Sequence, residues 1–558
     1  MRISLISGCL IAACHSGEPR DLQQIEQGPS IPDAGSDASL DGASPEPNEA
    51  GPVGGAGNDT HTDVPDAGDA EAGAVIEAGT VVEAGPPCGD GHTDLALGEE
   101  CDDGNNQHSD GCEIDCKKTR IVQMALGRLF TCALSSGGGV KCWGGDTESF
   151  GALGRGTSGA DVTDPMPIDV LDFGTSRRVT KLSASWDHVC VVFEDERARC
   201  WGFNYSGQLG IGTQLHYGDD LDEPLNALPD LPITGVKDIV ASSNNTCLIS
   251  DATGANNLYC WGFNRYGTLG IGSTVDKSTA DINDPAQLNA EPQQFALEGS
   301  ASCVIYDEGQ VRCFGAHGSG ELGCGLIDFD IGDGIGDGNG LGQLPDNPLL
   351  DVKGLPGPTS AIIGTGNTAT FCALIVGQLY CWGQMPVEVW EATGPLNLGD
   401  VSVTQAAFSD LHGCALDDHG VVRCWGNDED REGVLGYPGY SHAGGAREPV
   451  ADYQLMRDLF VDAGPTDGSA PTESLPLGAV DIGDFDGIPG LDPATYVWVG
   501  YRSSCALMQN GGVRCWGKNN FNRLGYGIAV PHIGYAQSPA ELYAQVGFSD
   551  IKVFGPRP

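Results

Sequence analysis

Basic residues are scarce in this 558-residue chain, which has 28 lysines and arginines against 77 aspartates and glutamates. The formal net charge at pH 7 is −49. Proteins that bind DNA or RNA neutralise phosphates with clustered basic side chains. We therefore expect no nucleic-acid partner, and we interpret the carboxylates as a solvating surface that can also attract cations.

Long hydrophobic runs and catalytic motifs are missing too. Beyond the N-terminus, no stretch approaches the ~18 to 20 apolar residues of a membrane-spanning helix. The sequence has no nucleophile elbow, phosphate-binding loop or His-x-x-x-His pair. His188 and His412 stand two residues before a repeated cysteine, where other copies have Phe, Asn, Ala, Thr or Ser, so we interpret both as structural. We expect a protein that is not an enzyme and requires no cofactor.

The N-terminus has the features of an export signal. Arg2 is followed by a short apolar stretch that ends at Ala13. The motif Ile11-Ala12-Ala13-Cys14 resembles a bacterial lipoprotein box, in which the cysteine is lipidated and becomes the mature N-terminus. We predict a signal peptide over residues 1–13 and a lipid anchor on Cys14. The protein would then be exported and held at the bacterial envelope, at the outer membrane or the cell surface, touching the membrane through its lipid only.

Residues 14–87 are rich in Asp, Glu, Ala, Gly, Pro and Ser, and Arg20 is their only lysine or arginine. A segment so acidic and so poor in aromatics cannot bury enough apolar surface to offset its chain entropy. We predict a disordered, self-repelling tether.

Residues 88–116 form a compact cysteine module, with cysteines at 88, 101, 112 and 116. The module resembles the short cysteine-rich repeats common in exported myxobacterial proteins. Four cysteines allow three pairings, and we expect Cys88, Cys101, Cys112 and Cys116 to pair among themselves. So small a unit needs disulfides to fold. Its Asp90, Asp102, Asp103, Asn105 and Asp110 fit either calcium ligation or Asx-rich turns.

From residue 120 to 558 the chain repeats one pattern seven times. Each copy has a cysteine, a short apolar pair, a turn, and then cysteine–aromatic–glycine. The aromatic positions are Trp143, Trp201, Trp261, Phe314, Trp382, Trp425 and Trp516. A Gly-x-Leu-Gly element follows in most copies, in full as Gly207-Gln208-Leu209-Gly210, and is absent from the fifth.

This pattern resembles the repeat of the regulator of chromosome condensation family, which implies an all-β, seven-bladed β-propeller. The family includes a nucleotide-exchange factor for a small GTPase and a secreted β-lactamase inhibitor, and both act through a propeller face. Neither activity is expected here, because the sequence shows no matching interface residues and an export signal contradicts a nuclear role.

The physics of the repeat leads to the same architecture. A copy of about four short strands cannot bury its own faces, whereas radial stacking buries Trp and Leu between sheets. We interpret proline-led segments, such as residues 165–170 and 539–542, as strands at the outer edge of a blade. Residues 551–555 look like the opening strand of an eighth copy.

The paired cysteines of each repeat are placed to face each other across a hairpin, at a distance that a disulfide can bridge. In an exported protein this usage predicts disulfides, and the alternative, zinc, lacks a second thiolate pair nearby. The predicted pairs are Cys132–Cys142, Cys190–Cys200, Cys247–Cys260, Cys303–Cys313, Cys372–Cys381, Cys414–Cys424 and Cys505–Cys515. Cys324 is left over, as a buried thiol or an intermolecular link.

Two acidic, glycine-rich insertions interrupt the repeats. Carboxylates that alternate with glycine can wrap a calcium ion, and flexible solvated loops are the alternative. The candidate calcium ligands are Asp330, Asp333, Asp337, Asp484 and Asp486.

Taken together, the sequence predicts a monomeric, surface-tethered, non-catalytic scaffold. We expect it to bind a protein, or another extracellular partner, through the loops on the rim of the propeller. Two alternatives stay open. One is an envelope structural lipoprotein without a specific partner, and the other is an enzyme or saccharide-processing propeller whose site is assembled from separate blades.

Overall fold

The computed structural model describes most of the chain from Cys88 onward. The predicted signal peptide, Cys14, the predicted tether and the five candidate calcium ligands of the acidic insertions lie outside the described residues. The described residues are 88–146, 150–156, 161–174, 177–288, 290–316, 320–324, 351–364, 370–383, 394–396, 398–409, 412–426, 432–436, 480, 482, 493–528, 530–534, 538–546 and 550–554.

Each of the seven repeats forms one antiparallel sheet. The sheets comprise β1 (Ile121–Leu126), β2 (Phe130–Ser135) and β3 (Val140–Gly144); β4 (Val179–Ala184), β5 (His188–Phe193) and β6 (Ala198–Gly202); β7 (Val236–Ser242), β8 (Asn245–Ser250) and β9 (Asn257–Gly262); β10 (Pro292–Glu298), β11 (Ala301–Tyr306) and β12 (Gln310–Gly315); β13 (Ala361–Gly364), β14 (Thr370–Ile375) and β15 (Gln378–Gly383); β16 (Val403–Phe408), β17 (His412–Asp417) and β18 (Val422–Gly426); and β19 (Ala494–Gly500), β20 (Ser503–Met508), β21 (Val513–Lys518) and β22 (His532–Ile533). The described residues also contain three helices: η1 (Leu95–Leu97), η3 (Asn520–Asn522) and α2 (Pro539–Val546).

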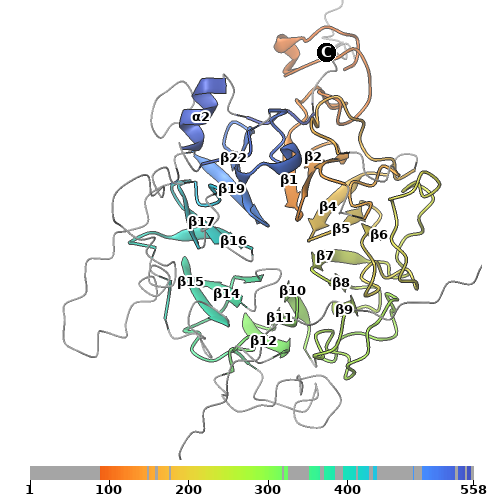
Figure 1. Cartoon of the computed structure of the whole chain (residues 1–558), viewed down its shortest axis with the longest axis vertical. Helices are drawn as coiled ribbons and strands as arrows, with labels where there is room; N and C mark the ends of the chain where they lie inside the picture. The colour runs from red at the N-terminus through yellow and green to blue at the C-terminus, as the bar shows by residue number, and fades with distance from the viewer. Residues whose placement is uncertain are drawn as a thin grey trace, which may run out of the picture. The chain divides into compact units, whose positions relative to one another are not determined.

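The seven sheets are the blades of a closed ring (Figure 1). The first strand of each blade packs against the first strand of the next, and β19 of the last blade packs against β1 of the first. The seven-bladed, all-β propeller expected from the repeat is therefore confirmed. These inner strands surround a central channel of about 360 Å³.

Within the described residues, six blades have three strands rather than the expected four, and the seventh adds the short β22. In place of a regular fourth strand, the amide of one residue in an outer segment donates a backbone hydrogen bond to the blade's third strand, at 2.7–3.0 Å. The donors are Leu171, Leu231, Ala286, Val352, Leu396, Val480 and Ile551. Further pairing with the third strands is limited to isolated bridges, such as Arg312–Asp351 and Tyr380–Pro395, so these segments form no continuous ladder.

This pattern corrects our interpretation of residues 551–555. The Ile551 amide donates to the Val513 carbonyl in β21, so this segment is the outer segment of the seventh blade and not the start of an eighth copy. Val553 lies in the same blade's core, and its carbonyl accepts a 2.9 Å hydrogen bond from Lys141 Nζ of the first blade. The segment therefore helps to close the ring.

The proline-led segments are also not strands. Residues 165–170 have no strand structure, and Pro539 is the first residue of α2. Ser538 and Glu541 form a reciprocal pair of side-chain-to-backbone hydrogen bonds, each 3.1 Å long, which is a capping box. The first amide of a helix has no intrahelical acceptor, so a proline at this position loses no hydrogen bond. Proline here is therefore compatible with a helix.

In five blades, a tryptophan joins the blade to the one before it. Its indole Nε1 donates to the carbonyl of the second residue in the Gly-x-Leu-Gly element of the preceding blade, at 2.8–3.0 Å. The bonds are Trp143–Arg523, Trp201–Ala152, Trp261–Gln208, Trp382–Glu321 and Trp516–Val434. The first of them joins the first blade to the last.

The final glycine of each element has a positive φ and lies against the next blade's aromatic ring. A Cβ at Gly210, for example, would stand 2.6 Å from Trp261. The two repeated motifs therefore contact each other between blades, which is why they occur together.

Glutamines of the inner strands add a second connection. The Gln123 side chain accepts from the Leu182 amide (3.0 Å) and donates to the Leu182 carbonyl (2.6 Å) of the next blade. Gln405 makes the same pair of bonds with Val497. The side-chain amide thus makes the two hydrogen bonds that a paired strand residue would make, and it connects two sheets whose strands are not paired.

Candidate interaction surface

The structure has seven disulfides within the blades, at the seven expected pairs. Each joins the second and third strands of a blade, where the two cysteines are direct partners in the register and their Cα atoms lie 4.0–4.1 Å apart. In the shortest hairpin, Val376 and Gly377 both have positive φ and form the expected two-residue turn between Ile375 and Gln378.

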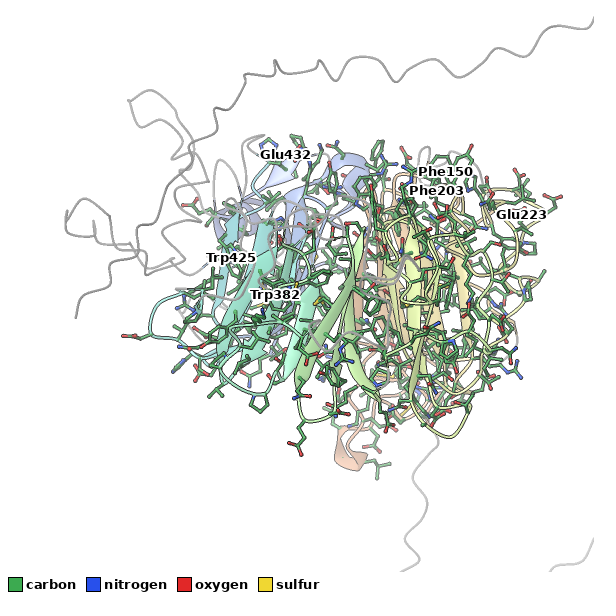
Figure 2. The ribbon with its side chains drawn as sticks, turned by 90° about the horizontal axis from the view of Figure 1, so that it is seen from below. Phe150, Phe203, Glu223, Trp382, Trp425 and Glu432 are labelled. Atoms are coloured by element: carbon green, nitrogen blue, oxygen red, sulfur yellow. A yellow bond between two sulfur atoms is a disulfide. The ribbon has the colours of Figure 1, made fainter. Side chains whose placement is uncertain are left out.

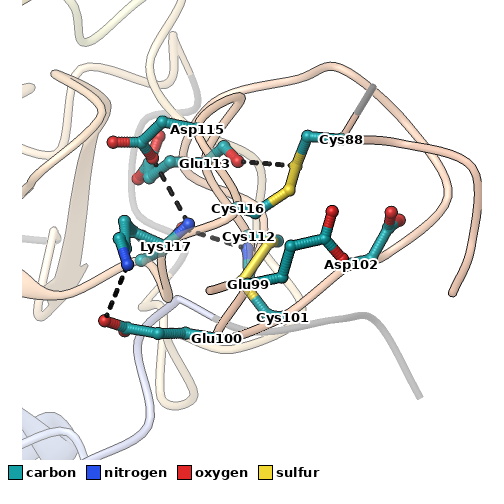
Figure 3. Close-up of a disulfide and its surroundings, with 12 residues drawn as sticks. Cys88, Glu99, Glu100, Cys101, Asp102, Cys112, Glu113, Asp115, Cys116 and Lys117 are labelled. Carbon is teal, nitrogen blue, oxygen red and sulfur yellow. Dashed lines mark hydrogen bonds and ion pairs between the residues drawn. A yellow bond between two sulfur atoms is a disulfide. The ribbon is translucent and has the colours of Figure 1, made fainter. Parts of the chain in front are cut away.

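The cysteine module pairs Cys88 with Cys116 and Cys101 with Cys112, which decides among the three pairings (Figure 3). The carboxylate of Asp102 accepts hydrogen bonds from the backbone amides of residues 89, 90, 91 and 104, and these bonds lower its pKa. The Asx-turn interpretation therefore holds for this residue.

The module packs against the hairpin turn between β2 and β3. Ser109 Oγ lies 2.5 Å from Ser135 Oγ and accepts a hydrogen bond from the Gly139 amide. Ser136 Oγ donates to Glu113 at 3.1 Å. The described part of the chain thus begins, at Cys88, on the face of the propeller that carries these turns, which we call the turn face.

The two repeat histidines are structural, as predicted. The ring of His188 lies 3.0 Å from Thr246 Oγ1 of the next blade, and His412 Nε2 lies 2.7 Å from Ser504 Oγ of the next. Both are buried, and burial lowers the pKa of each to about 3. They are therefore neutral at physiological pH and brace neighbouring blades.

Cys324 is fully buried, next to the glycine that contacts Trp382. This position agrees with the buried-thiol interpretation and leaves no exposed sulfur for an intermolecular link. None of the helices in the described part of the chain has the length and hydropathy of a membrane-spanning segment.

Exposed aromatic residues gather on the opposite face, where the third strand of each blade ends and the Gly-x-Leu-Gly loops follow. Figure 2 shows Phe150, Phe203 and Glu223 together at the upper rim, while the module, in pale orange, lies at the other end of the strands. We call this the loop face. Four side chains from the first two blades form what we call the aromatic surface: Phe150, Phe203, Tyr205 and His216.

Their rings form a continuous cluster. Phe203 lies 4.9 Å from Phe150 and 5.3 Å from Tyr205, centroid to centroid, and stacks on His216 at 5.1 Å. Phe150 and Tyr205 each also contact His216, at 4.8 and 5.2 Å. Tyr205 is 68% exposed and Phe150 37%. Leu215, directly before His216 in the same loop, is 74% exposed.

An asparagine fixes the loop that carries this cluster. The Asn204 side chain donates to the carbonyls of Thr213 and Leu215 and accepts from the Leu209 amide. The backbone amide of Asn204 donates a hydrogen bond to His216 Nδ1 at 3.0 Å, and this bond orients the imidazole. Because both ends of the loop are bound to one buried side chain, the aromatic rings are held in place before any partner arrives.

Phe150 is held in a conformation that side chains usually avoid. Its φ is +51°, in the left-handed region, which is uncommon for a bulky residue. Such strain persists only where surrounding contacts determine it, and it concentrates at functional sites. Here it keeps an aromatic ring at the surface, directly before the Gly151 that packs on the neighbouring loop.

An acidic loop borders the aromatic surface. Residues 219–223 read Asp-Asp-Leu-Asp-Glu, and the loop lies on the first blade, where the Gly156 amide donates to the Gly218 carbonyl. Burial, and then the charges of Asp219 and Asp220, raise the pKa of Glu223. Among the ion pairs of the described residues, none uses a carboxylate of this loop. Leu221 at its tip is 83% exposed.

Sequence reasoning did not find this surface. Phe150 belongs to the first repeat and the other three rings to the second, so only the packing of blades brings them together. The signal that was available lies in the second copy, where Phe203 and Tyr205 flank the loop asparagine and an acidic pentapeptide follows.

Comparison with known proteins agrees with the repeat pattern. Residues 121–150, 179–208, 497–523 and 256–302 match models of the regulator of chromosome condensation (RCC1) repeat. The chain therefore contains RCC1 repeats at these positions. The matches cover the first two blades and most of the seventh, and the match at 256–302 runs from the third strand of the third blade into the second strand of the fourth.

Curated proteins with this repeat are similar over about half of the chain. The ultraviolet-B receptor UVR8 of Arabidopsis thaliana is 26% identical over 331 residues, covering 55% of this chain and 65% of the receptor. The guanine nucleotide exchange factor SRM1 of Saccharomyces cerevisiae is 24% identical over 318 residues, covering 54% of this chain and 60% of the factor. The match to human E3 ubiquitin-protein ligase HERC2 is 25% identical and spans 6% of that protein.

Two solved structures are also similar to the chain. Human WBSCR16 covers 75% of this chain, at 17% identity and a TM-score of 0.37. Yeast RCC1 (Prp20), solved with Kap60 bound, covers 68% at 16% identity and a TM-score of 0.42. The chain spans less than two thirds of the length of the curated relatives above, so their activities are not carried over to it.

Proposed function

We propose that this protein is an exported, non-catalytic propeller scaffold that binds a protein partner through the aromatic surface. The observation that carries the proposal is a cluster of rings that is exposed, preorganised and bordered by uncompensated acids. Aromatic side chains dominate the energetics of protein interfaces, and exposed clusters of them mark docking sites.

The chemistry of the surface favours a cationic segment of the partner. A lysine or arginine can lie over the face of Tyr205 or Phe203 while its charge is met by the carboxylates of the acidic loop. An apolar neighbour would contact Leu215 and Leu221. The protein's net charge of −49 adds long-range attraction for such a partner and repels acidic ones.

The disulfides support export. Nine disulfides in the described residues indicate an oxidising compartment. If Cys14 carries a lipid and residues 14–87 form a tether, the anchor joins the molecule through the turn face. A disordered tether would leave the loop face, with its aromatic surface, free to reach partners.

A photo-crosslinking experiment tests the docking surface. Benzoylphenylalanine replaces Tyr205 or, as the matched control, Val275, which is 71% exposed in the equivalent loop of the third blade. On intact cells we expect a discrete adduct from position 205 and none from position 275. Excess wild-type protein should compete for this adduct, and excess Tyr205→Ser/Leu221→Ser protein should not. Equal labelling from both positions would refute the proposed surface.

A fractionation experiment tests the anchor. Cys14→Ala should release the protein from the membrane fraction without changing its crosslinking in solution. Retention of Cys14→Ala in that fraction would show that something other than a lipid on Cys14 holds the protein there.

A further inference from the structure

One hydrogen bond recurs in the loops of the loop face, but its acceptor differs from blade to blade. In four blades, the backbone amide two residues after the Trp-Gly motif donates to an acceptor further along the same loop. These bonds are Asp146 N–H to Asp161 Oδ1 (3.1 Å), Asn204 N–H to His216 Nδ1 (3.0 Å), Asn264 N–H to Asp276 Oδ1 (2.8 Å) and Asn519 N–H to the Pro531 carbonyl (2.7 Å).

The imidazole of the second blade is the acceptor among these four that mild acid can remove. A carboxylate or a backbone carbonyl accepts a hydrogen bond throughout the range from about pH 5 to 8. An imidazole nitrogen accepts one only while it carries no proton, and histidine changes its protonation within this range. The bond from the Asn204 amide therefore depends on pH, and the equivalent bond from Asn264 in the third blade does not.

His216 is also the centre of the aromatic surface. Its ring stacks on Phe203 at 5.1 Å, with an angle of 17° between the ring planes, and contacts Phe150 and Tyr205 at 4.8 and 5.2 Å. The bond from Asn204 requires a lone pair on Nδ1, so the neutral ring carries its proton on Nε2. When Nδ1 is protonated, two N–H donors face each other, and the imidazole has to leave this position.

The backbone around His216 is held by bonds that do not titrate. Tyr217 and Gly202 exchange two backbone hydrogen bonds, at 2.8 and 3.2 Å. The Asn204 side chain holds the carbonyls of Thr213 and Leu215, as described above. Protonation should therefore displace the imidazole and the rings that it touches, while the loop keeps its path.

The charges near His216 place this change below neutral pH. Burial lowers the pKa of His216, and the charge of Asp219 partly opposes this effect. The bond from Asn204 is therefore intact at pH 7.5 and is lost as the pH falls below the ordinary histidine value of about 6.5. Tyr205 is the other titratable side chain in contact with the ring. Glu223, whose pKa is raised, is the carboxylate of this surface most able to take up a proton over the same range.

We propose that His216 makes partner binding pH-dependent: its protonation displaces the imidazole from the aromatic surface and places a positive charge where a cationic segment would dock. The partner is then bound at neutral pH and released in mild acid. This regulation rests on the proposed function, because it concerns the same surface. The loss of the bond from the Asn204 amide rests on the geometry of the loop alone.

Hydrogen exchange of the full chain tests the bond without a partner. The protection of the Asn204 amide is measured at pH 7.5 and 5.0, with each rate divided by the intrinsic rate at that pH. We expect it to fall by at least about 5-fold at pH 5.0, whereas the Asn264 amide, bonded to Asp276, should stay within about 2-fold in the same sample. Equal protection of the Asn204 amide at the two pH values would overturn the proposal.

Three variants separate His216 from the other acids of the surface. His216→Asn supplies an oxygen acceptor that does not titrate, so the protection should no longer depend on pH. His216→Phe keeps a ring without an acceptor, so the protection should be low at both pH values. Glu223→Gln keeps an acceptor for the Gly218 amide, 3.1 Å away in the wild type, and should retain the pH response. A response that persists in His216→Asn would assign the effect to another group.

Photo-crosslinking from position 205 tests the consequence for the partner. Intact cells are labelled at pH 7.5 and 5.0 in the wild-type and His216→Asn backgrounds, and each background is normalised to its own adduct at pH 7.5. The adduct should fall by about 10-fold at pH 5.0 in the wild-type background and by less than about 2-fold in His216→Asn. Equal losses in both backgrounds would contradict the role of His216. An adduct absent at both pH values would refute the docking surface instead, and the hydrogen-exchange result would still decide whether His216 controls the loop.

Discussion

The bond that closes the ring gives the sharpest test of the fold's energetics. Trp143 in the first blade donates to the Arg523 carbonyl of the seventh, at 3.0 Å. No peptide bond joins these blades directly, so their contact depends on such side chains. Trp143→Phe removes the donor but keeps a ring, as the natural Phe314 does at the same position of the fourth blade.

The expected loss is worked from two terms. Leaving the buried Arg523 carbonyl without its donor costs about 1–3 kcal/mol. The smaller ring leaves a void of roughly 40 Å³ at a side chain that is 0% exposed, which adds about 1 kcal/mol. Trp143→Phe should therefore lower the free energy of unfolding by about 2–4 kcal/mol.

Trp425→Phe is the matched control. The described residues contain no carbonyl acceptor for Trp425, and the fifth repeat lacks the Gly-x-Leu-Gly element that would supply one. This variant should lose only the ~1 kcal/mol of the volume term. Urea unfolding gives the stabilities, and hydrogen exchange should speed up in the first and seventh blades of Trp143→Phe alone. Equal losses in both variants, with no local change in exchange, would refute the assignment of a stabilising bond.

Two further predictions concern the interior of the blades. First, the buried His188 and His412 have pKa values near 3, against an unfolded value near 6.5, so the unfolded state binds protons first as the pH falls. Their contribution to stability is constant above about pH 6.5 and declines below it, by about 1.4 kcal/mol per pH unit for each histidine. The double variant His188→Gln/His412→Gln should show a shallower fall between pH 7 and 5, and an unchanged slope would contradict the linkage. Second, Cys303→Ala/Cys313→Ala removes a disulfide with a sequence separation of 10. It should lower stability by about 2–3 kcal/mol in the chain-entropy model while far-ultraviolet circular dichroism stays unchanged; an unchanged urea midpoint would argue against that contribution.

The local repeat was readable from the sequence because its determinants are local. The spacing of two cysteines in a hairpin decides whether they face each other. The seven disulfides, and the turn at Val376 and Gly377, could therefore be predicted from the sequence. The helix at Pro539 was missed although its capping residues, Ser538 and Glu541, are visible in the sequence. We predicted an edge strand there from the proline, although the capping box of Ser538 and Glu541 favours a helix.

Features between blades could not be read in the same way. The outer segments pair with the third strands through single hydrogen bonds and isolated bridges, and they leave no periodic pattern in the sequence. The Gln123 and Gln405 connections and the tryptophan–carbonyl bonds depend on how the sheets are stacked. The aromatic surface depends on the same stacking, since Phe150 and Phe203 come from different repeats. The ring, rather than any one repeat, creates both its own closure and its candidate binding surface.

The central claim is that a partner docks on the aromatic surface of the loop face. Once the crosslinked partner is identified, its affinity for three purified proteins tests this claim most directly: the wild type, Tyr205→Ser/Leu221→Ser and Val275→Ser. Two exposed anchor residues at the centre of an interface typically contribute ~1–2 kcal/mol each, so we expect the double variant to bind at least 10-fold more weakly and the control within 2-fold of the wild type. Equal affinity of all three proteins would contradict the account.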